Sequence, residues 1–191
     1  NKLLTITGPG ANSLTVSGGN LIRIFRVGGA GNLTVSGLTL ANGKGGDVGG
    51  AIVSDGTLTM NNCAVVNSSA GSGWGGGGVY QAGGIGFFRD CTFSGNTAAV
   101  GGGLHVINSS STILGSTISG NTATTSGGAV KFETIGGGAS KSLTVTSSTI
   151  AGNNSGGTGG ILVEAAAGIS ALLNIRNTIV SANQNANLAK N

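Results

Sequence analysis

The sequence predicts an all-β chain whose many short strands stack as the coils of a parallel β-solenoid. Of its 191 residues, 40 are Gly and one is Pro, while charged residues make up only 7%. Thr, Ser, Val and Ile are common, whereas the helix formers Glu, Lys, Gln and Met are scarce. A pattern of apolar and small residues also recurs along almost the whole chain, which indicates a repeat architecture.

The first element of each repeat is an apolar residue followed by two small residues and Asn. Full copies begin at Phe93, Ile118, Ile150 and Val180, and degenerate copies begin at Leu40 and Val65. Successive copies are separated by 25, 28, 25, 32 and 30 residues. Because these lengths vary, the extra residues are expected in loops such as Ile135–Lys141.

A second apolar column lies five residues before each Asn motif, and it is preceded by mostly polar residues. Its members are Val35, Met60, Phe88, Ile113, Val145 and Ile175. Alternation with a period of two is typical of a strand that buries one face.

Pairs of glycines that lead into apolar residues mark the third element of the repeat. They occur in Gly49–Ile52, Gly77–Val79, Gly102–Leu104, Gly127–Val130 and Gly159–Leu162. Each repeat therefore carries about three short strands, joined at corners rich in Gly, Asn and Ser.

No two-residue Asn-Gly turn lies between matched strands, so hairpins are not expected. Each strand instead pairs with its counterpart in the next repeat, about 4.8 Å away, and roughly seven coils give a rod of about 35 Å. The Asn motifs then stack into a structural ladder of side-chain amides, formed by Asn96, Asn121, Asn153 and Asn183.

The length suits a single β-solenoid domain over residues 1–191. No capping helix is evident at either end, so we expect a segment of a longer chain or a subunit that stacks on neighbouring copies.

These motifs resemble those of known bacterial proteins. The Gly-Gly-Ala-Ile of Gly49–Ile52 and the Phe-x-x-Asn of Phe93–Asn96 resemble repeats of polymorphic outer-membrane proteins. The opening Leu4–Asn12, followed by Gly37–Leu40, is similar to secreted proteins of the pectate-lyase-like superfamily. The resemblance implies a right-handed parallel β-helix outside a bacterial cell or on its surface. It does not imply one activity, since the superfamily includes lyases, hydrolases, adhesins and structural segments.

A lyase-like or hydrolase site would need acidic residues that converge on one face. The five acids are Asp47, Asp55, Asp90, Glu133 and Glu164. In the expected register they do not stack, because Asp47 and Asp55 flank one strand, Asp90 precedes an Asn-motif strand and Glu133 follows a glycine-pair strand. Val163 is expected to follow Lys131 outward, which places Glu164 in the inward column of Val106 and Phe132, so either a corner falls at Glu164 or the last coils slip by one residue. We therefore expect no enzymatic activity, no metal and no cofactor.

A candidate binding strip follows the glycine pairs. Tyr80, His105 and Lys131 are expected to point outward on three consecutive coils, with Trp74 in the loop just before them. Such a strip could stack against a glycan. The alternative interpretation is a mixed column that simply faces solvent.

The two cysteines, Cys63 and Cys91, occupy equivalent positions on adjacent coils, with Cα atoms about 5 Å apart. Their column continues as Ser116 and Ser148. Both a disulfide and two small buried thiols are compatible with this placement.

Charge and hydropathy exclude two further roles. The nine basic residues are scattered, so no nucleic-acid partner is expected. The most apolar stretch, Ile161–Leu173, contains an acid and is too short to insert into a membrane.

The sequence thus predicts a non-enzymatic, extracellular structural or adhesive β-helix that stacks end to end on copies of itself or adjoins neighbouring domains of the same chain. The alternative is a carbohydrate-binding or polysaccharide-degrading module. An ice-binding solenoid is a minor alternative, because Thr-x-Thr triplets recur but are interrupted at Phe87, Arg89 and Arg176.

Overall fold

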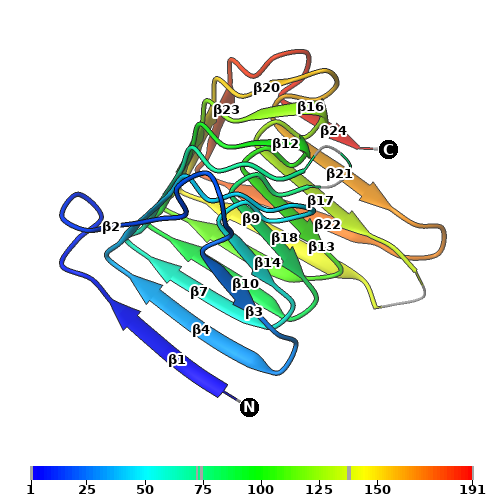
Figure 1. The fold of residues 1–191 in the computed structure, drawn as a ribbon. Coiled ribbons are helices and arrows are strands. Elements are labelled where there is room, and N and C mark those ends of the chain that lie inside the picture. The colour runs from blue at the N-terminus through cyan, green and yellow to red at the C-terminus, as the bar shows by residue number, and fades with distance from the viewer. Residues whose placement is uncertain (1, 72, 74, 137–138, 191) are drawn as a thin grey trace.

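The described residues form 24 β-strands, which pair in parallel with strands one coil away (Figure 1). The computed structural model describes residues 2–71, 73, 75–136 and 139–190. Three seven-stranded parallel sheets run along the stack, and we name them A, B and C in the order in which the chain meets them.

The longest strands form sheet A. They are β1 (Lys2–Thr7), β4 (Gly31–Ser36), β7 (Thr57–Asn61), β10 (Ile85–Arg89), β14 (Ser110–Leu114), β18 (Lys141–Thr146) and β22 (Ala171–Arg176). Sheet B consists of three-residue strands, namely β2 (Thr15–Ser17), β5 (Thr39–Ala41), β8 (Ala64–Val66), β11 (Thr92–Ser94), β15 (Thr117–Ser119), β19 (Thr149–Ala151) and β23 (Ile179–Ser181).

Sheet C follows the glycine pairs. Its strands are β3 (Phe25–Val27), β6 (Ile52–Ser54), β9 (Val79–Ala82), β13 (Leu104–Ile107), β17 (Val130–Thr134), β21 (Ile161–Ala165) and β24 (Leu188–Lys190). One strand from each sheet makes one coil, so the prediction of about seven coils with three strands each is confirmed.

A fourth, three-stranded sheet was not predicted. It contains β12 (Thr97–Val100), β16 (Thr122–Ser126) and β20 (Asn154–Ser155), which directly follow the Asn motifs. These segments are short and lack apolar alternation, so their pairing depends on the coils above and below rather than on local sequence.

Stacked apolar columns fill the interior. The sheet A column predicted from the sequence pairs in register from Val35 through Met60 and Phe88 to Ile175. The sheet B column passes from Leu40 through Phe93 to Val180. The side chains of these columns lie in one continuous buried core.

The corner between sheets A and B requires a left-handed backbone conformation. One residue in each of six coils has a positive φ there: Gly37, Asn62, Asp90, Gly115, Ser147 and Asn177. Gly, Asn and Asp adopt this left-handed conformation most readily, so they mark the point where each coil turns.

Candidate functional site

The predicted strip lies on the middle column of sheet C. Tyr80 on β9 is in register with His105 on β13, and His105 is in register with Lys131 on β17. The neighbours Leu104 and Val106 are fully buried in the core, so the His105 side chain between them lies on the opposite face of the sheet. The structure therefore stacks these three residues on consecutive coils. Trp74, the fourth predicted member, lies outside the described residues.

The strip does not face open solvent. His105 is only 3% exposed, and the side chain of Lys131 is 13% exposed. Gly75, which forms an isolated bridge with Val100, lies against the imidazole, so that a Cβ atom at this position would collide with Nδ1. The loop that precedes β9 thus packs over His105.

Four charged or polar side chains form one connected chain of contacts. His105 Nε2 lies 2.8 Å from Glu133 Oε1. Lys131 Nζ lies 3.0 Å from Glu133 Oε2 and 2.9 Å from Glu164 Oε2. Tyr80 contacts the imidazole edge to face, with ring centroids 5.1 Å apart and planes at 85°. We call His105, Glu133, Lys131 and Glu164 the ion-pair ladder.

The ladder shifts the pKa values of its members. Burial by itself raises the pKa of Glu133, but hydrogen bonds and charges from His105 and Lys131 outweigh it and hold that pKa below its usual range. Burial by itself lowers the pKa of Lys131, but hydrogen bonds and charges from Glu164 and Glu133 outweigh it and raise that pKa above its usual value. Burial and the nearby carboxylate of Glu133 raise the pKa of Tyr80. His105 Nδ1 is buried and has no hydrogen-bond partner among the described residues.

The expected register of the last coils was wrong by one residue. Leu162, not Val163, follows Lys131 in the outward column, and Glu164 pairs with Glu133. The cause lies in the glycine pairs. Ala129 occupies the position that Gly103 and Gly160 hold on adjacent coils, so the pair Gly127–Gly128 comes one residue earlier than its counterparts.

The expectation that no acids stack was therefore also wrong, and sequence reasoning missed Glu133 and Glu164 as partners of the strip. Both carboxylates line a hollow of about 310 Å³ together with Ile135, Ala165 and Ala166. A glycosidase needs one carboxyl group that stays protonated as the general acid. Lys131 bridges the two carboxylates, and the lowered pKa of Glu133 favours its ionised form, so these contacts join adjacent coils.

The asparagine ladder is present at the corner that follows sheet B. Asn96, Asn121 and Asn153 are buried, and each donates from its backbone N–H and its Nδ2 to the Oδ1 of the next rung. Asn183 continues the series to Asn187, and Ser68 begins it by donating its N–H to Asn96. Every amide is thus paired within the fold, which leaves none of these buried rungs available to a ligand.

Cys63 and Cys91 belong to a second ladder, at the corner between sheets A and B. Both are free thiols and 2% exposed. The Sγ of Cys91 donates to the carbonyl of Arg89 at 3.1 Å, and the Oγ of Ser116 donates to Leu114 at 2.9 Å in the equivalent geometry one coil later. The proximity of the two thiols lowers the pKa of Cys63, whereas that proximity and burial raise the pKa of Cys91.

Comparison with protein-family models decides the family. Residues 23–189 match the model described as a right-handed beta helix region, which covers most of the chain. The chain is a right-handed β-helix protein. Neither the curated proteins nor the solved structures contain a match to it.

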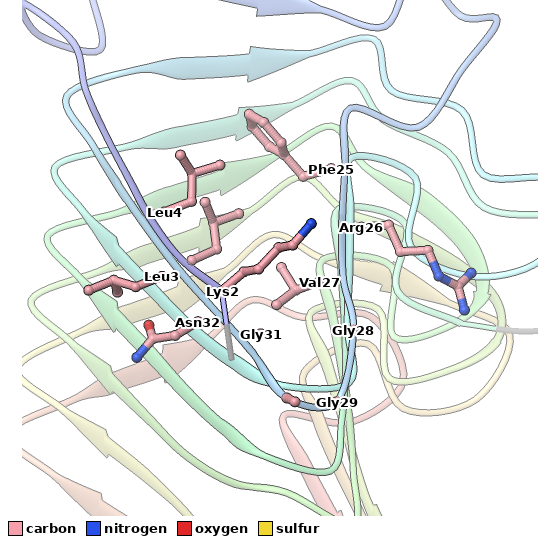
Figure 2. Close-up of a pocket in the computed structure, with 12 residues that line it drawn as sticks. Lys2, Leu3, Leu4, Phe25, Arg26, Val27, Gly28, Gly29, Gly31 and Asn32 are labelled. Carbon is pink, nitrogen blue, oxygen red and sulfur yellow. The ribbon is translucent and has the colours of Figure 1, made fainter.

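A large hollow of this β-helix lies at the open edge of its first coil. It measures about 830 Å³ and is lined by Leu4, Phe25, Val27 and Leu33, of which Val27 and Leu33 belong to the buried core and Phe25 packs against it. Figure 2 shows Phe25 and Arg26 pointing to opposite sides of their strand. The hollow is therefore an uncovered cross-section of the β-helix interior.

Within the described residues, no group of three or more His, Cys, Asp or Glu side chains is placed to hold a metal ion. The described part of the β-helix also contains no helix with the length and hydropathy needed to cross a membrane.

Proposed function

We propose that this β-helix is a non-enzymatic structural or adhesive rod that works outside a bacterial cell, in a surface or secreted protein. The observation that carries the proposal is the closure of the ion-pair ladder. His105, Lys131 and Glu133 are largely buried and are linked through Glu133, so these polar groups, together with Glu164, join three coils instead of offering reactive groups. Similarity of the repeats to those of polymorphic outer-membrane proteins supports the location and the adhesive role.

An attachment assay tests the adhesive role. Beads coated with the purified chain are expected to adhere to cell or matrix-coated surfaces more than beads coated with the same chain after irreversible heat unfolding. Equal attachment of the two preparations contradicts adhesion by the folded rod. Release of unsaturated uronides or reducing sugar ends from a polysaccharide panel would contradict the non-enzymatic assignment.

The strand edges of the first and last coils support an assembly role for the rod. Leu3 and Leu4 on β1 are 74% and 53% exposed, and Leu188 on β24 is 48% exposed. We infer that these edges pair with further coils, supplied by the same polypeptide or by another copy stacked end to end. Negative-stain microscopy of this chain at high concentration is expected to show fibres if copies stack, and only short uniform rods would contradict self-stacking.

Carbohydrate binding is the second candidate function, because Tyr80 is only half-buried and lies beside the ion-pair ladder. A glycan array with wild type and Tyr80→Val, which introduces the residue found at Val53 one coil earlier, separates the candidates. Loss of a glycan signal in the variant would favour the carbohydrate-binding module over the rod.

A further inference from the structure

The outward face of sheet A carries a feature that the core and the ladders do not explain. Its middle column is composed of hydroxyl and amide side chains in six of seven coils and of a phenyl ring in the fourth. The members are Thr5, Thr34, Thr59, Phe87, Thr112, Thr144 and Asn174. An outward aromatic ring among Thr neighbours has no packing role in the interior.

Phe87 is 44% exposed and makes no ring contact with another aromatic residue described in the structure. Arg89 lies two residues further along β10, so it projects from the same face. Its guanidinium forms no hydrogen bond or ion pair with the described residues. A hollow of about 120 Å³ lies between the coils here, lined by Phe87, Arg89, Thr59, Asn61, Thr112 and Leu114. We call these six residues the Phe87–Arg89 patch.

The charge around the patch is entirely positive on this face. The outward positions of sheet A include Arg89 and Arg176 and no Asp or Glu. The carboxylate nearest in sequence, Asp90, lies at the corner and lines a separate hollow with Asn62 and Thr92. An exposed guanidinium with no counter-ion on its own face is a ready partner for a carboxylate, which it can bind through two parallel hydrogen bonds.

The spacing between Phe87 and Arg89 indicates what kind of anionic ligand fits the patch. Phe87 and Arg89 are separated by two residues of strand, about 6.8 Å. In an extended peptide, side chains two residues apart project to the same side with that same spacing. We propose that the Phe87–Arg89 patch binds an extended acidic polypeptide segment of another protein, in which an apolar side chain covers Phe87 and a carboxylate two residues away pairs with Arg89.

A membrane surface matches the patch less well. Stable attachment to a bilayer needs a broad apolar surface beside the basic residues. Here, the apolar neighbours of Phe87 on this face are Ile85 on the same strand and Leu114 on the next, while Thr59 and Asn61 on one side and Thr112 on the other are polar, so the apolar surface is narrow. The proposal rests on the proposed adhesive role, for which it supplies a contact surface and a class of partner.

Fluorescence polarisation with labelled synthetic peptides tests the proposal. A peptide of Leu-Ser-Glu-Ser repeats places Leu and Glu on one side of an extended chain, whereas Leu-Glu-Ser-Ser repeats of the same composition place adjacent Leu and Glu on opposite sides. The full chain is expected to bind the first peptide at least about tenfold more tightly than the second, with an affinity that falls as salt is added.

Two substitutions use residues already present in the same columns, so they should leave the fold intact by circular dichroism. Phe87→Thr reproduces Thr59 and Thr112, and Arg89→Asn reproduces Asn61. Each is expected to weaken peptide binding about tenfold. Arg26→Asn is the matched control, since it removes an exposed Arg from sheet C and should leave binding unchanged.

Equal binding of the two peptides, or equal binding by the wild type and both patch variants, overturns the proposal. So does binding to phosphatidylserine vesicles or oligogalacturonate that depends on Phe87 and Arg89 when the peptide does not bind. Bead attachment separates this inference from the proposed function. If beads coated with Phe87→Thr and with Arg89→Asn still attach, the patch proposal is contradicted and the adhesive role stands. If beads coated with the wild type do not attach, the adhesive role itself is contradicted.

Discussion

The side-chain oxygen of Asn121 accepts two hydrogen bonds from Asn96, one from the backbone N–H and one from Nδ2, both at 3.0 Å. The Nδ2 of Asn121 in turn donates to the carbonyl of Phe93 and to the Oδ1 of Asn153, both at 2.9 Å. One side chain therefore satisfies polar groups on the coils before and after its own, in a position with no access to water.

Removal of the Asn121 side chain should strongly destabilise the fold. Asn121→Ala leaves buried donors on Asn96 and a buried carbonyl on Phe93 without partners, and each such group costs about 1–3 kcal/mol. We expect a loss of about 3–5 kcal/mol in the free energy of unfolding, measured by urea titration with circular dichroism. Asn183→Ala at a half-buried rung is the control and should lose about 1 kcal/mol, because water can replace its contacts. Equal losses would contradict the ladder as the source of the effect.

Close coil-to-coil approach predicts the response of two glycines to substitution. A Cβ atom on Gly77 would lie 2.4 Å from the carbonyl oxygen of Gly102 and 2.6 Å from the backbone of Thr97, so the coils must separate in Gly77→Ala. The expected loss of stability is about 3 kcal/mol. Gly46, which has open space around its Cα, should tolerate Ala with a change of less than about 1 kcal/mol. Thermal unfolding of the two variants compares them directly, and similar melting temperatures would contradict steric exclusion at Gly77.

The ion-pair ladder predicts stability that declines at both ends of the pH range. The pKa of Glu133 is lower in the folded chain than its ordinary 4.5, so its contribution is present above that value and is lost as the pH falls through the folded pKa. The pKa of Lys131 is higher than its ordinary 10.5, so its contribution is present below that value and is lost as the pH rises through the folded pKa. Unfolding free energies from pH 2 to pH 12 should show both declines.

Substitutions assign these declines to residues. Glu133→Gln should reduce the acid-side decline, and Lys131→Met should reduce the alkaline-side decline. Asp55→Asn, at an exposed carboxylate 3.8 Å from Arg26, is the control and should leave both sides unchanged. An acid-side decline of undiminished size in Glu133→Gln would show that other carboxylates cause it.

The cysteine pair predicts thiols that are inaccessible in spite of the lowered pKa of Cys63. Both side chains are buried, so Ellman's reagent should titrate no thiol in the native chain and two after unfolding in urea. The double variant Cys63→Ser and Cys91→Ser should lose less than about 1.5 kcal/mol, because Ser116 and Ser148 make the same contacts on later coils. Cys91→Val cannot donate to the carbonyl of Arg89 and is expected to lose more. A titre that rises only after a reductant is added would reveal a disulfide.

The sequence predicted the core and the amide ladder because both depend on strictly local patterns. Val35 through Ile175 alternate with mostly polar residues, and the Asn motif keeps a fixed distance from that column. The ion-pair ladder was only half predicted. Its register depends on whether Ala or Gly occupies the position before the strand, and the glycine pairs alone cannot show that Gly160 takes the place of Ala129 on the next coil.

The burial of His105 could not be predicted for a different reason. An outward residue on a strand normally faces solvent, and the cover over this one comes from Gly75, thirty residues earlier in the chain. Whether a loop folds over a strand depends on the path of the whole loop, which no local pattern encodes. The acid-free outward face of sheet A, in contrast, could have been read from the alternation once the strands were aligned.

The rungs of the asparagine ladder have one further consequence. Successive rungs are 25, 32 and 30 residues apart, yet the hydrogen bonds that join them measure 3.0, 3.0 and 3.1 Å. The pitch of the rod is therefore independent of the contour length of each coil. A segment added to an outer loop would lengthen the perimeter without displacing the coils above it, so this architecture can exchange or enlarge its displayed segments while its axial dimension stays constant.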